Sequence, residues 1–318
     1  MVELLRKLRP AYFPPNRKLI GNEILEEVYM ETDRSDCKKE VTLVQDGWGT
    51  NQTQPVVAHS VHSGSKAFFL NAVAPGSATK DADYCLGVLS AAIEECQNVH
   101  KCQVIGFVTD NCNVMLSLRN KLHESHPDIF VFGCNAHYLN LVGQKVIPHD
   151  KIDNIVKIQK YFKNHHFQSA ALSAAKGKRP VLPGLTRWNS QIDCIENYIE
   201  NHAIYLDLRV KIRKFDNNIT QMINDFSLYT AAEKLKSLAK PIAVALDKVQ
   251  SNSASLSDAV SEWIKLRNDC PFENDSCYTY FQRKLTEALN ETALAAYILD
   301  PRYRGNGTLL LRRRFKAR

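Results

Sequence analysis

The sequence predicts an α/β protein in which a mixed β-sheet is followed by a long helical region. Three features of the chain support this fold class. Closely spaced strand-like runs come first, between residues 41 and 74. Apolar runs that alternate with helical patterns come next, as in parallel sheets with helical crossovers. Beyond Pro148 the apolar residues recur almost throughout with helical spacing, so a helical domain is expected after the sheet.

Length and composition are those expected of a soluble globular protein. The 318 residues are enough for about two domains of roughly 150 residues each, and 44% of them are hydrophobic. A net charge of +7 and a pI near 8.8 favour acidic partners such as nucleic acid. No stretch approaches the ~18 consecutive apolar residues of a membrane span, so no membrane partner is expected.

Cysteine usage points to a reducing compartment. The nine cysteines are odd in number and irregularly spaced, and the chain opens with charge and proline instead of the apolar core of a secretory signal. We therefore expect reduced thiols in an intracellular protein. The basic C-terminal segment "RRRFKAR" is either a nuclear-entry or phosphate-binding patch or a frayed tail, and a nuclear location is the expectation.

The first strands are expected to form an antiparallel meander. A helical lead-in over residues 1–40, with a Pro-Pro break and a helical pattern at residues 20–33, precedes them. Strand-like runs cover residues 41–48, 55–62 and 67–74. The connections between them are short and contain Gly, Asn and Ser, which suit tight turns between antiparallel neighbours.

Parallel strands are expected after the meander. A helix is predicted over residues 81–96, a fourth strand over 103–110 and a helix from Asn111. A buried fifth strand over 129–134 leads into a helix over 135–147. Since a helical crossover is the usual connection between parallel neighbours, the fourth strand is expected beside the first and parallel to it.

The helical region is interrupted by glycine, proline and charge at residues 176–190 and 268–277. The expected organisation is a lead-in (1–40), a sheet domain (41–190), a helical region (191–300) and a basic tail (301–318).

Two aspartates mark the ends of predicted strands. Asp46 closes the first strand and Asp110 closes the fourth, so parallel pairing would set their carboxylates side by side. Carboxylates that close repel unless a cation or proton lies between them, and hard oxygen ligands suit Mg²⁺ or Mn²⁺. Such a pair can support two-metal phosphoryl transfer. The alternative is that each aspartate caps the turn or helix that follows it.

Several segments together resemble the hAT superfamily of DNA transposases, and most closely a related family of domains of unknown function with the same ribonuclease H-like core. The segments occur in the family's order from about residue 8 to residue 304, which makes the set specific although each one is weak. They are "LRPAYFPPNRKLIGNEILEEVY", "DGW", "VTDN", "FGCNAHYLNL", "TRWNS" and "AAYILDPRY".

The resemblance implies a ribonuclease H-like domain with a helical insertion that, in active members, cuts and joins DNA. Asp46 and Asp110 match the first two members of the family's D-D-E catalytic and metal-binding set. Cys134 and His137 match its C-x-x-H motif. The remaining matches and basic neighbours are assigned to DNA binding: Arg187, Trp188, Lys176, Lys178 and Arg179.

These residues also have plain structural alternatives. Cys134 and His137 supply only two ligands, short of the four of a structural zinc site, so we expect no zinc and favour a buried, hydrogen-bonded pair that shapes the site. Trp188 could stack on an unpaired base or anchor the core between domains. The basic residues nearby favour DNA contact.

The third acid of the set is not identified. In the family it lies beyond the "LDPRY" region, in a part that also mediates dimerisation, whereas here the chain ends fourteen residues after Arg304. The glutamates that precede this point are no clear substitutes: Glu262, Glu273, Glu287 and Glu291. We therefore expect a truncated relative that does not dimerise through this part.

Three functional hypotheses follow. The first is a transposase-derived, ribonuclease H-like protein that binds Mg²⁺ or Mn²⁺ and DNA weakly and does not catalyse strand transfer. The second is an active metal-dependent transposase or nuclease whose third acid comes from another glutamate or from a partner. The third is a protein-interaction scaffold in which the motifs serve only for packing.

Overall fold

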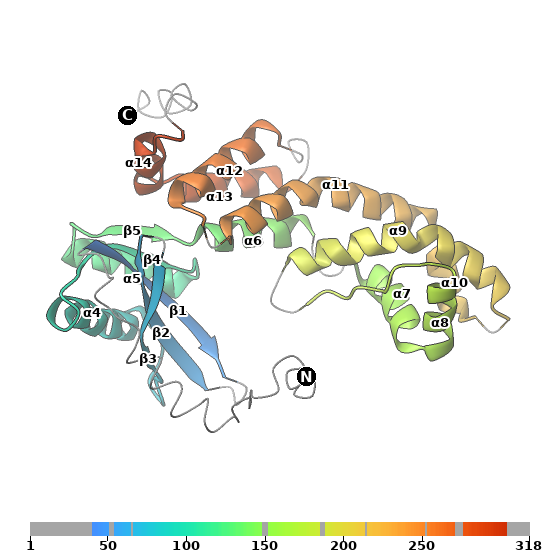
Figure 1. Ribbon diagram of the computed structural model, residues 1–318, viewed down its shortest axis with the longest axis horizontal. Helices are drawn as coiled ribbons and strands as arrows, with labels where there is room; N and C mark the ends of the chain where they lie inside the picture. Colours follow the sequence, from blue (N-terminus) through green and yellow to red (C-terminus); the bar gives the residue numbers. More distant parts are fainter. Residues whose placement is uncertain are drawn as a thin grey trace, which may run out of the picture.

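A computed structural model describes residues 40–50, 54–64, 66–147, 152–184, 188–213, 215–251, 253–270 and 276–303 (Figure 1). The lead-in before Glu40 and the tail beyond Tyr303 lie outside these residues, as do Arg187 and Glu273. No helix in the described ranges is long and apolar enough to cross a membrane.

The predicted mixed sheet is confirmed. Its five strands have the order β3-β2-β1-β4-β5, in which β1, β2 and β3 form the antiparallel meander and β4 and β5 run parallel to β1. The strands are β1 (Glu40–Gly49), β2 (Pro55–Ser63), β3 (Lys66–Val73), β4 (Gln103–Thr109) and β5 (Phe130–Gly133).

One face of the sheet is covered by α4 (Ala82–Asn98) and α5 (Asn113–Ser125) (Figure 1). Alternate residues of β1 point to this face, where Val41 and Leu43 are almost fully buried. They join the inward residues of both helices in one hydrophobic core. On the opposite face of β1, Thr42 and Val44 are only half-buried, and this is the face that carries Asp46.

The rest of the described chain is helical, and no strand follows β5 within it. Its elements are α6 (Asn135–Val146), α7 (Asp153–Asn164), α8 (His166–Ala174), α9 (Asn189–Lys211), α10 (Asn217–Asn224), α11 (Phe226–Val249), α12 (Leu256–Asn268), α13 (Tyr278–Ala288) and α14 (Glu291–Leu299). These helices share a second hydrophobic core, separate from that of the sheet.

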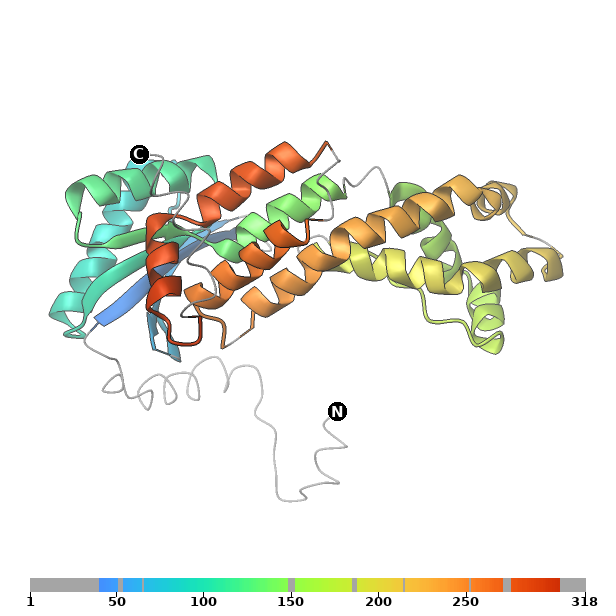
Figure 2. The same ribbon diagram turned by 90° about the horizontal axis from the view of Figure 1, so that it is seen from above.

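The molecule is elongated, with the sheet at one end and α7, α8 and α10 at the other (Figures 1 and 2). Helix α6 leaves the edge of the sheet and packs against α11 and α13. Helices α9 and α11 lie side by side and connect the two ends. At 24 residues, α11 is about 36 Å long. The N-terminus of α9 and the C-terminus of α11 consequently face the edge of the sheet where α6 begins.

Candidate functional site

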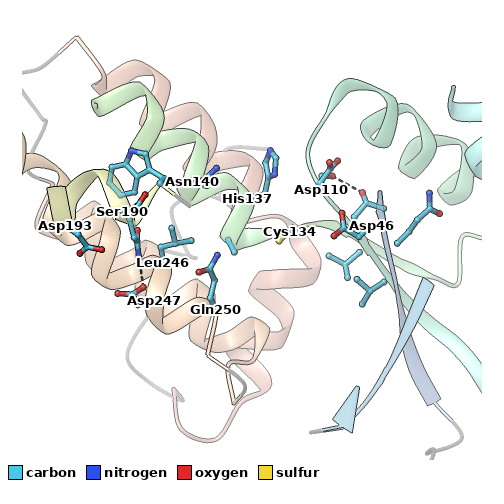
Figure 3. Close-up of a pocket in the computed structure, with 17 residues that line it drawn as sticks. Asp46, Asp110, Cys134, His137, Asn140, Ser190, Asp193, Leu246, Asp247 and Gln250 are labelled. Carbon is cyan, nitrogen blue, oxygen red and sulfur yellow. Dashed lines mark hydrogen bonds between the residues drawn. The ribbon is translucent and has the colours of Figure 1, made fainter. Parts of the chain in front are cut away.

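The two aspartates follow paired positions on adjacent parallel strands. The last parallel pair of β1 and β4 is Gln45 with Thr109, so Asp46 and Asp110 come next on each strand. Figure 3 shows them side by side. The strand pairing predicted from the order of elements is thus confirmed. The prediction that Asp46 ends its strand is wrong, because pairing with β2 continues β1 to Gly49.

Each carboxylate also accepts a hydrogen bond from a backbone N–H one or two residues further along the chain. Asp46 Oδ1 accepts a hydrogen bond of 2.8 Å from the backbone N–H of Gly47, and Asp110 Oδ1 accepts one of 3.1 Å from that of Cys112. Helix α5 begins at Asn113, not at Asn111, and its N-cap residue is Cys112. Asp110 therefore orders the turn before the helix. The Cys112 thiol also bonds to the Asp110 carboxylate, whereas Asp46 Oδ2 has no hydrogen-bond partner among the described residues.

A buried arginine braces the loop that carries Asp110. The Arg119 guanidinium, on α5, donates to the Thr109 hydroxyl at 2.6 Å and to the Asp110 carbonyl oxygen. Its side chain is 6% exposed, and burial lowers its pKa. Sequence reasoning missed this residue. The sequence does contain a signal for it, because Arg119 lies between Leu118 and Leu122, which are both on the buried face of the helix.

The loops after β4 and β5 are joined. The Asn111 amide donates to the Cys134 carbonyl oxygen at 2.9 Å, and the Cys134 N–H donates to the Thr109 carbonyl oxygen at 2.8 Å. A side chain at Gly133 would lie 1.9 Å from Asn111 Oδ1, so only glycine allows this approach. These contacts place the start of α6 directly beside the aspartates.

Cys134 and His137 therefore lie at the same edge of the sheet. Burial and both aspartates raise the pKa of the Cys134 thiol, and the backbone N–H groups of His137 and Ala136 oppose that shift. Burial lowers the pKa of His137, while Asp110 and Asp46 oppose that shift. No three His, Cys, Asp or Glu side chains of the described ranges are placed to share one metal ion. Any cation here would have to complete its shell with water.

The edge aspartates line a cavity of about 740 Å³ between the sheet, α6 and the facing ends of α9 and α11 (Figure 3). Its opposite wall carries Asp193 and Asp247, which sequence reasoning missed because they lie within ordinary helical patterns. Burial raises the pKa of Asp193, and Asp247 Oδ1 accepts a hydrogen bond of 2.6 Å from the Asn189 amide. Among the described residues that line the cavity there are four aspartates and no lysine or arginine.

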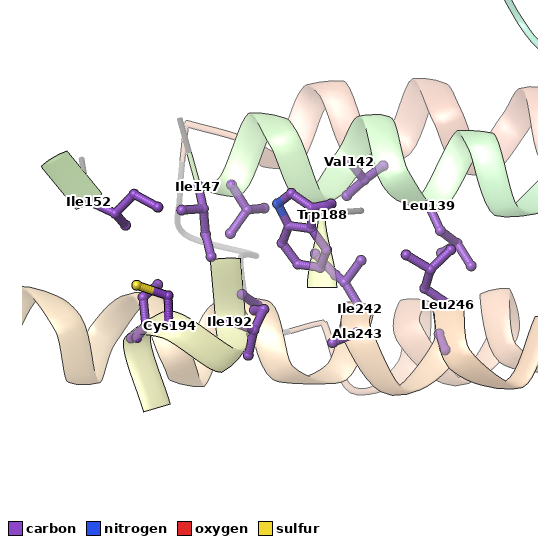
Figure 4. Close-up of a cluster of buried hydrophobic side chains, with 14 of the residues drawn as sticks. Leu139, Val142, Ile147, Ile152, Trp188, Ile192, Cys194, Ile242, Ala243 and Leu246 are labelled. Carbon is purple, nitrogen blue, oxygen red and sulfur yellow. The ribbon is translucent and has the colours of Figure 1, made fainter. Parts of the chain in front are cut away.

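Trp188, which the resemblance assigns to DNA binding, is a buried residue of the structure. Its side chain is 3% exposed and lies in the helical core between α6 and α11 (Figure 4). A Cβ atom at Gly143 would lie 2.4 Å from two carbons of the indole, so α6 packs directly against the ring. Trp188 also lines the acidic cavity, but its burial favours the alternative of a core anchor over stacking on a base. Arg187, its expected partner in DNA binding, lies outside the described residues.

The basic residues predicted to bind DNA lie away from the aspartates. Lys176, Lys178 and Arg179 are exposed. The Lys178 ammonium pairs with Glu200 at 2.8 Å, and its backbone bonds to Asn201. Asn201 lies twelve residues along α9 from Asn189 at the cavity, or about 18 Å of helix.

None of the described glutamates considered for the role of third acid lines the cavity. Glu262 is 8% exposed and is held by Lys248 and Lys265 at 3.2 and 2.7 Å. Glu287 pairs with Lys284 at 2.6 Å, and Glu291 lies in the first turn of α14.

Fold and site together define the chain as an α/β protein with a five-stranded mixed sheet and an acidic cavity where the sheet meets a helical region. Residues 15–161 match the model of a protein family described as "Domain of unknown function (DUF659)". The described part of this match contains the whole sheet, α4, α5, α6 and most of α7. No curated protein matches the chain.

Proposed function

We propose that this chain is a transposase-related, ribonuclease H-like protein that binds Mg²⁺ or Mn²⁺ at Asp46 and Asp110, binds DNA weakly, and does not cut it. The observation that carries the proposal is the position of the two carboxylates, next to each other on parallel strands at the wall of an open cavity. The family match over residues 15–161 supports the transposase-related origin.

A divalent cation suits this edge for electrostatic reasons. Neighbouring carboxylates repel, and the described lining of the cavity holds no lysine or arginine to neutralise them. Asp46 keeps one carboxylate oxygen that forms no hydrogen bond in the described ranges. Two oxygen ligands with water in the remaining positions is an arrangement that Mg²⁺ accepts. Cys134 and His137 would shape the edge beside the ion without binding zinc, since two such ligands do not complete a structural zinc site.

We infer the absence of cutting from the third acid, because none of the described glutamates considered for that role lines the cavity. Phosphoryl transfer by two metal ions needs protein ligands for both ions, because one ion stabilises the attacking oxygen and the other the leaving oxygen. Glu262 is engaged by two lysines, and Glu287 is paired with Lys284. A single ion held by two aspartates would position DNA poorly for in-line displacement.

The test is Mn²⁺ binding by the purified chain, followed by electron paramagnetic resonance. Asp46→Asn and Asp110→Asn should each weaken binding by about tenfold or more, because each removes one charged ligand. Asp83→Asn, an exposed aspartate that pairs with Lys121 on the far face of the sheet, is the matched control and should bind as the wild type does.

Equal Mn²⁺ affinity in wild type and both site variants would contradict the proposed cation site and leave the interaction scaffold as the better reading. Incubation with Mn²⁺ and a pre-nicked DNA should give no cleavage above the Asp46→Asn background. Cleavage by the wild type that Asp46→Asn abolishes would instead establish the active transposase or nuclease.

A further inference from the structure

A second cavity lies at the end of the molecule opposite the sheet. It has a volume of about 320 Å³ and lies between the end of α7, helix α8 and the segment that follows α8. Its polar lining consists of Lys163, Arg179, Ser169 and Ser173, and no acidic side chain of the described residues lines it. Its charge is therefore opposite to that of the cavity beside Asp46.

The charges of this basic pocket are not neutralised within the described structure. Lys163 and Arg179 form no ion pair within the described residues, whereas Lys178, the sequence neighbour of Arg179, is paired with Glu200 on α9 at 2.8 Å. The hydroxyls of Ser169 and Ser173 likewise have no hydrogen-bond partner in the described ranges. The two basic side chains and the two hydroxyls that line this pocket supply the hydrogen-bond donors that a phosphate group requires.

The segment that carries Arg179 is held rigidly against α9. The Asn201 side chain accepts from the Lys178 N–H at 2.8 Å and donates to its carbonyl oxygen at 2.9 Å. The Asn197 amide donates to the Arg179 carbonyl oxygen at 3.1 Å. Both asparagines are buried, at 1% and 6% exposure. A backbone fixed in this way lowers the entropy lost when the arginine binds a ligand.

The end of α8 adds a further cation next to the pocket. The N–H of Lys176 bonds to the Ser173 carbonyl and that of Gly177 to the Leu172 carbonyl, the paired bonds of a Schellman motif. Lys176 takes the left-handed position with φ of 60°, where glycine is usual and other residues cost about 1 kcal/mol. The chain thus places an exposed lysine where local stability would favour glycine.

We propose that the basic pocket binds a phosphate of a nucleic-acid backbone. Arg179 would hold two phosphate oxygens, Lys163 would neutralise the charge, and the two serine hydroxyls would donate to the remaining oxygens. The inference rests on the proposed DNA binding and assigns it to a surface separate from the cation site. The net charge of +7 and the exposed Lys176 favour a polyanion over a single free phosphate.

The experiment measures binding of a fluorescent 20-nucleotide single-stranded DNA by anisotropy between 50 and 200 mM salt, conditions in which phosphate contacts dominate the salt dependence. EDTA is present, so that no cation bound at Asp46 contributes. The double variant Lys163→Gln/Arg179→Gln should bind about tenfold more weakly at the lowest salt, and its salt slope should shrink by about 1 to 2. Lys157→Gln on the same helix α7, outside the pocket lining, is the matched control and should keep the wild-type slope.

Two further arms separate the sources of phosphate. Inorganic phosphate alone should bind far more weakly than the oligonucleotide, and an oligonucleotide with uncharged methylphosphonate linkages should not bind. Tight binding of inorganic phosphate without oligonucleotide binding would overturn the assignment to nucleic acid. Circular dichroism of the double variant should match the wild type, because both substituted side chains are exposed.

Failure of this inference can be distinguished from failure of the proposed function. An unchanged salt slope in the double variant, with Mn²⁺ binding still lost in Asp46→Asn, would refute the phosphate pocket and leave the cation site standing. No oligonucleotide binding by the wild type would refute both the pocket and the DNA-binding part of the proposed function.

Discussion

The sheet and the far end of the helical region each carry a cavity, and the two cavities are lined by side chains of opposite charge. At the sheet, the parallel pairing of β1 and β4 places Asp46 and Asp110 together, and the described lining of their cavity is acidic. At the other end, the end of α7, helix α8 and the segment after it enclose a basic pocket. The two ends have separate hydrophobic cores. The proposed cation site and the proposed phosphate pocket therefore lie on parts of the molecule that substitutions can test independently.

The largest change in stability is expected at Trp188, which lies in the helical core next to the acidic cavity. Trp188→Ala should lower the free energy of unfolding by about 3–5 kcal/mol, because it removes a buried indole from the helical core. Trp48→Ala, at the far end of β1 where the ring is 50% exposed, should change it by no more than about 0.5 kcal/mol. Urea unfolding of both variants measures the difference. Similar small losses would show that Trp188 is not a core residue and would restore base stacking as its role.

A smaller effect, of opposite sign in the two regions, is expected from glycine substitutions. Gly143→Ala should destabilise the chain by about 1–3 kcal/mol, because the new methyl group would overlap the Trp188 ring. Gly87→Ala, in α4 below the sheet, meets no atom within 4 Å and should stabilise by about 0.5–1 kcal/mol through helix propensity. Thermal midpoints that move in the same direction would contradict the close packing of α6 on Trp188.

The smallest effect is a pH dependence that belongs to the sheet. His59 is fully buried, with its ring nitrogens 2.7 Å from Asn71 Oδ1 and 3.1 Å from Gln45 Oε1. Burial lowers its pKa, and the Asn71 contact and Glu95 oppose that shift. The folded chain therefore holds this proton less tightly than the unfolded chain, whose histidine pKa is about 6.5. Stability from this group is present above that pH and is lost as the pH falls toward the folded value.

His59→Gln should remove this part of the pH dependence. Urea unfolding at pH 7.5 and 5.5 should show a smaller loss of stability on acidification in the variant than in the wild type, because glutamine does not titrate. His137 and His202, whose pKa values burial also lowers, remain in both proteins and cancel in the comparison. An equal loss in both would show that His59 is not the titrating group.

Much of the sheet was predictable because its determinants are local. Short polar connections specified the meander of β1, β2 and β3, and helical spacing between apolar runs specified the crossover that sets β4 beside β1. The adjacency of Asp46 and Asp110 followed from that topology. The end of β1 could not be predicted in this way. Pairing with β2 extends the strand to Gly49, and the residues of β1 alone do not indicate that pairing.

By itself the sequence determined the fold class, the antiparallel meander, the parallel pairing of β1 with β4 and the adjacency of Asp46 and Asp110, since periodicity and connection length act over a few residues. Only the tertiary structure decided which distant side chains meet. It buried Trp188 against Gly143, brought Asp193 and Asp247 to face the sheet, and placed Arg119 under the Asp110 loop. It also joined Lys163 to Arg179 in one pocket. Such contacts depend on how whole helices pack. The sequence does not specify them, because one amphipathic pattern is compatible with many packing partners and with several rotations about the helix axis.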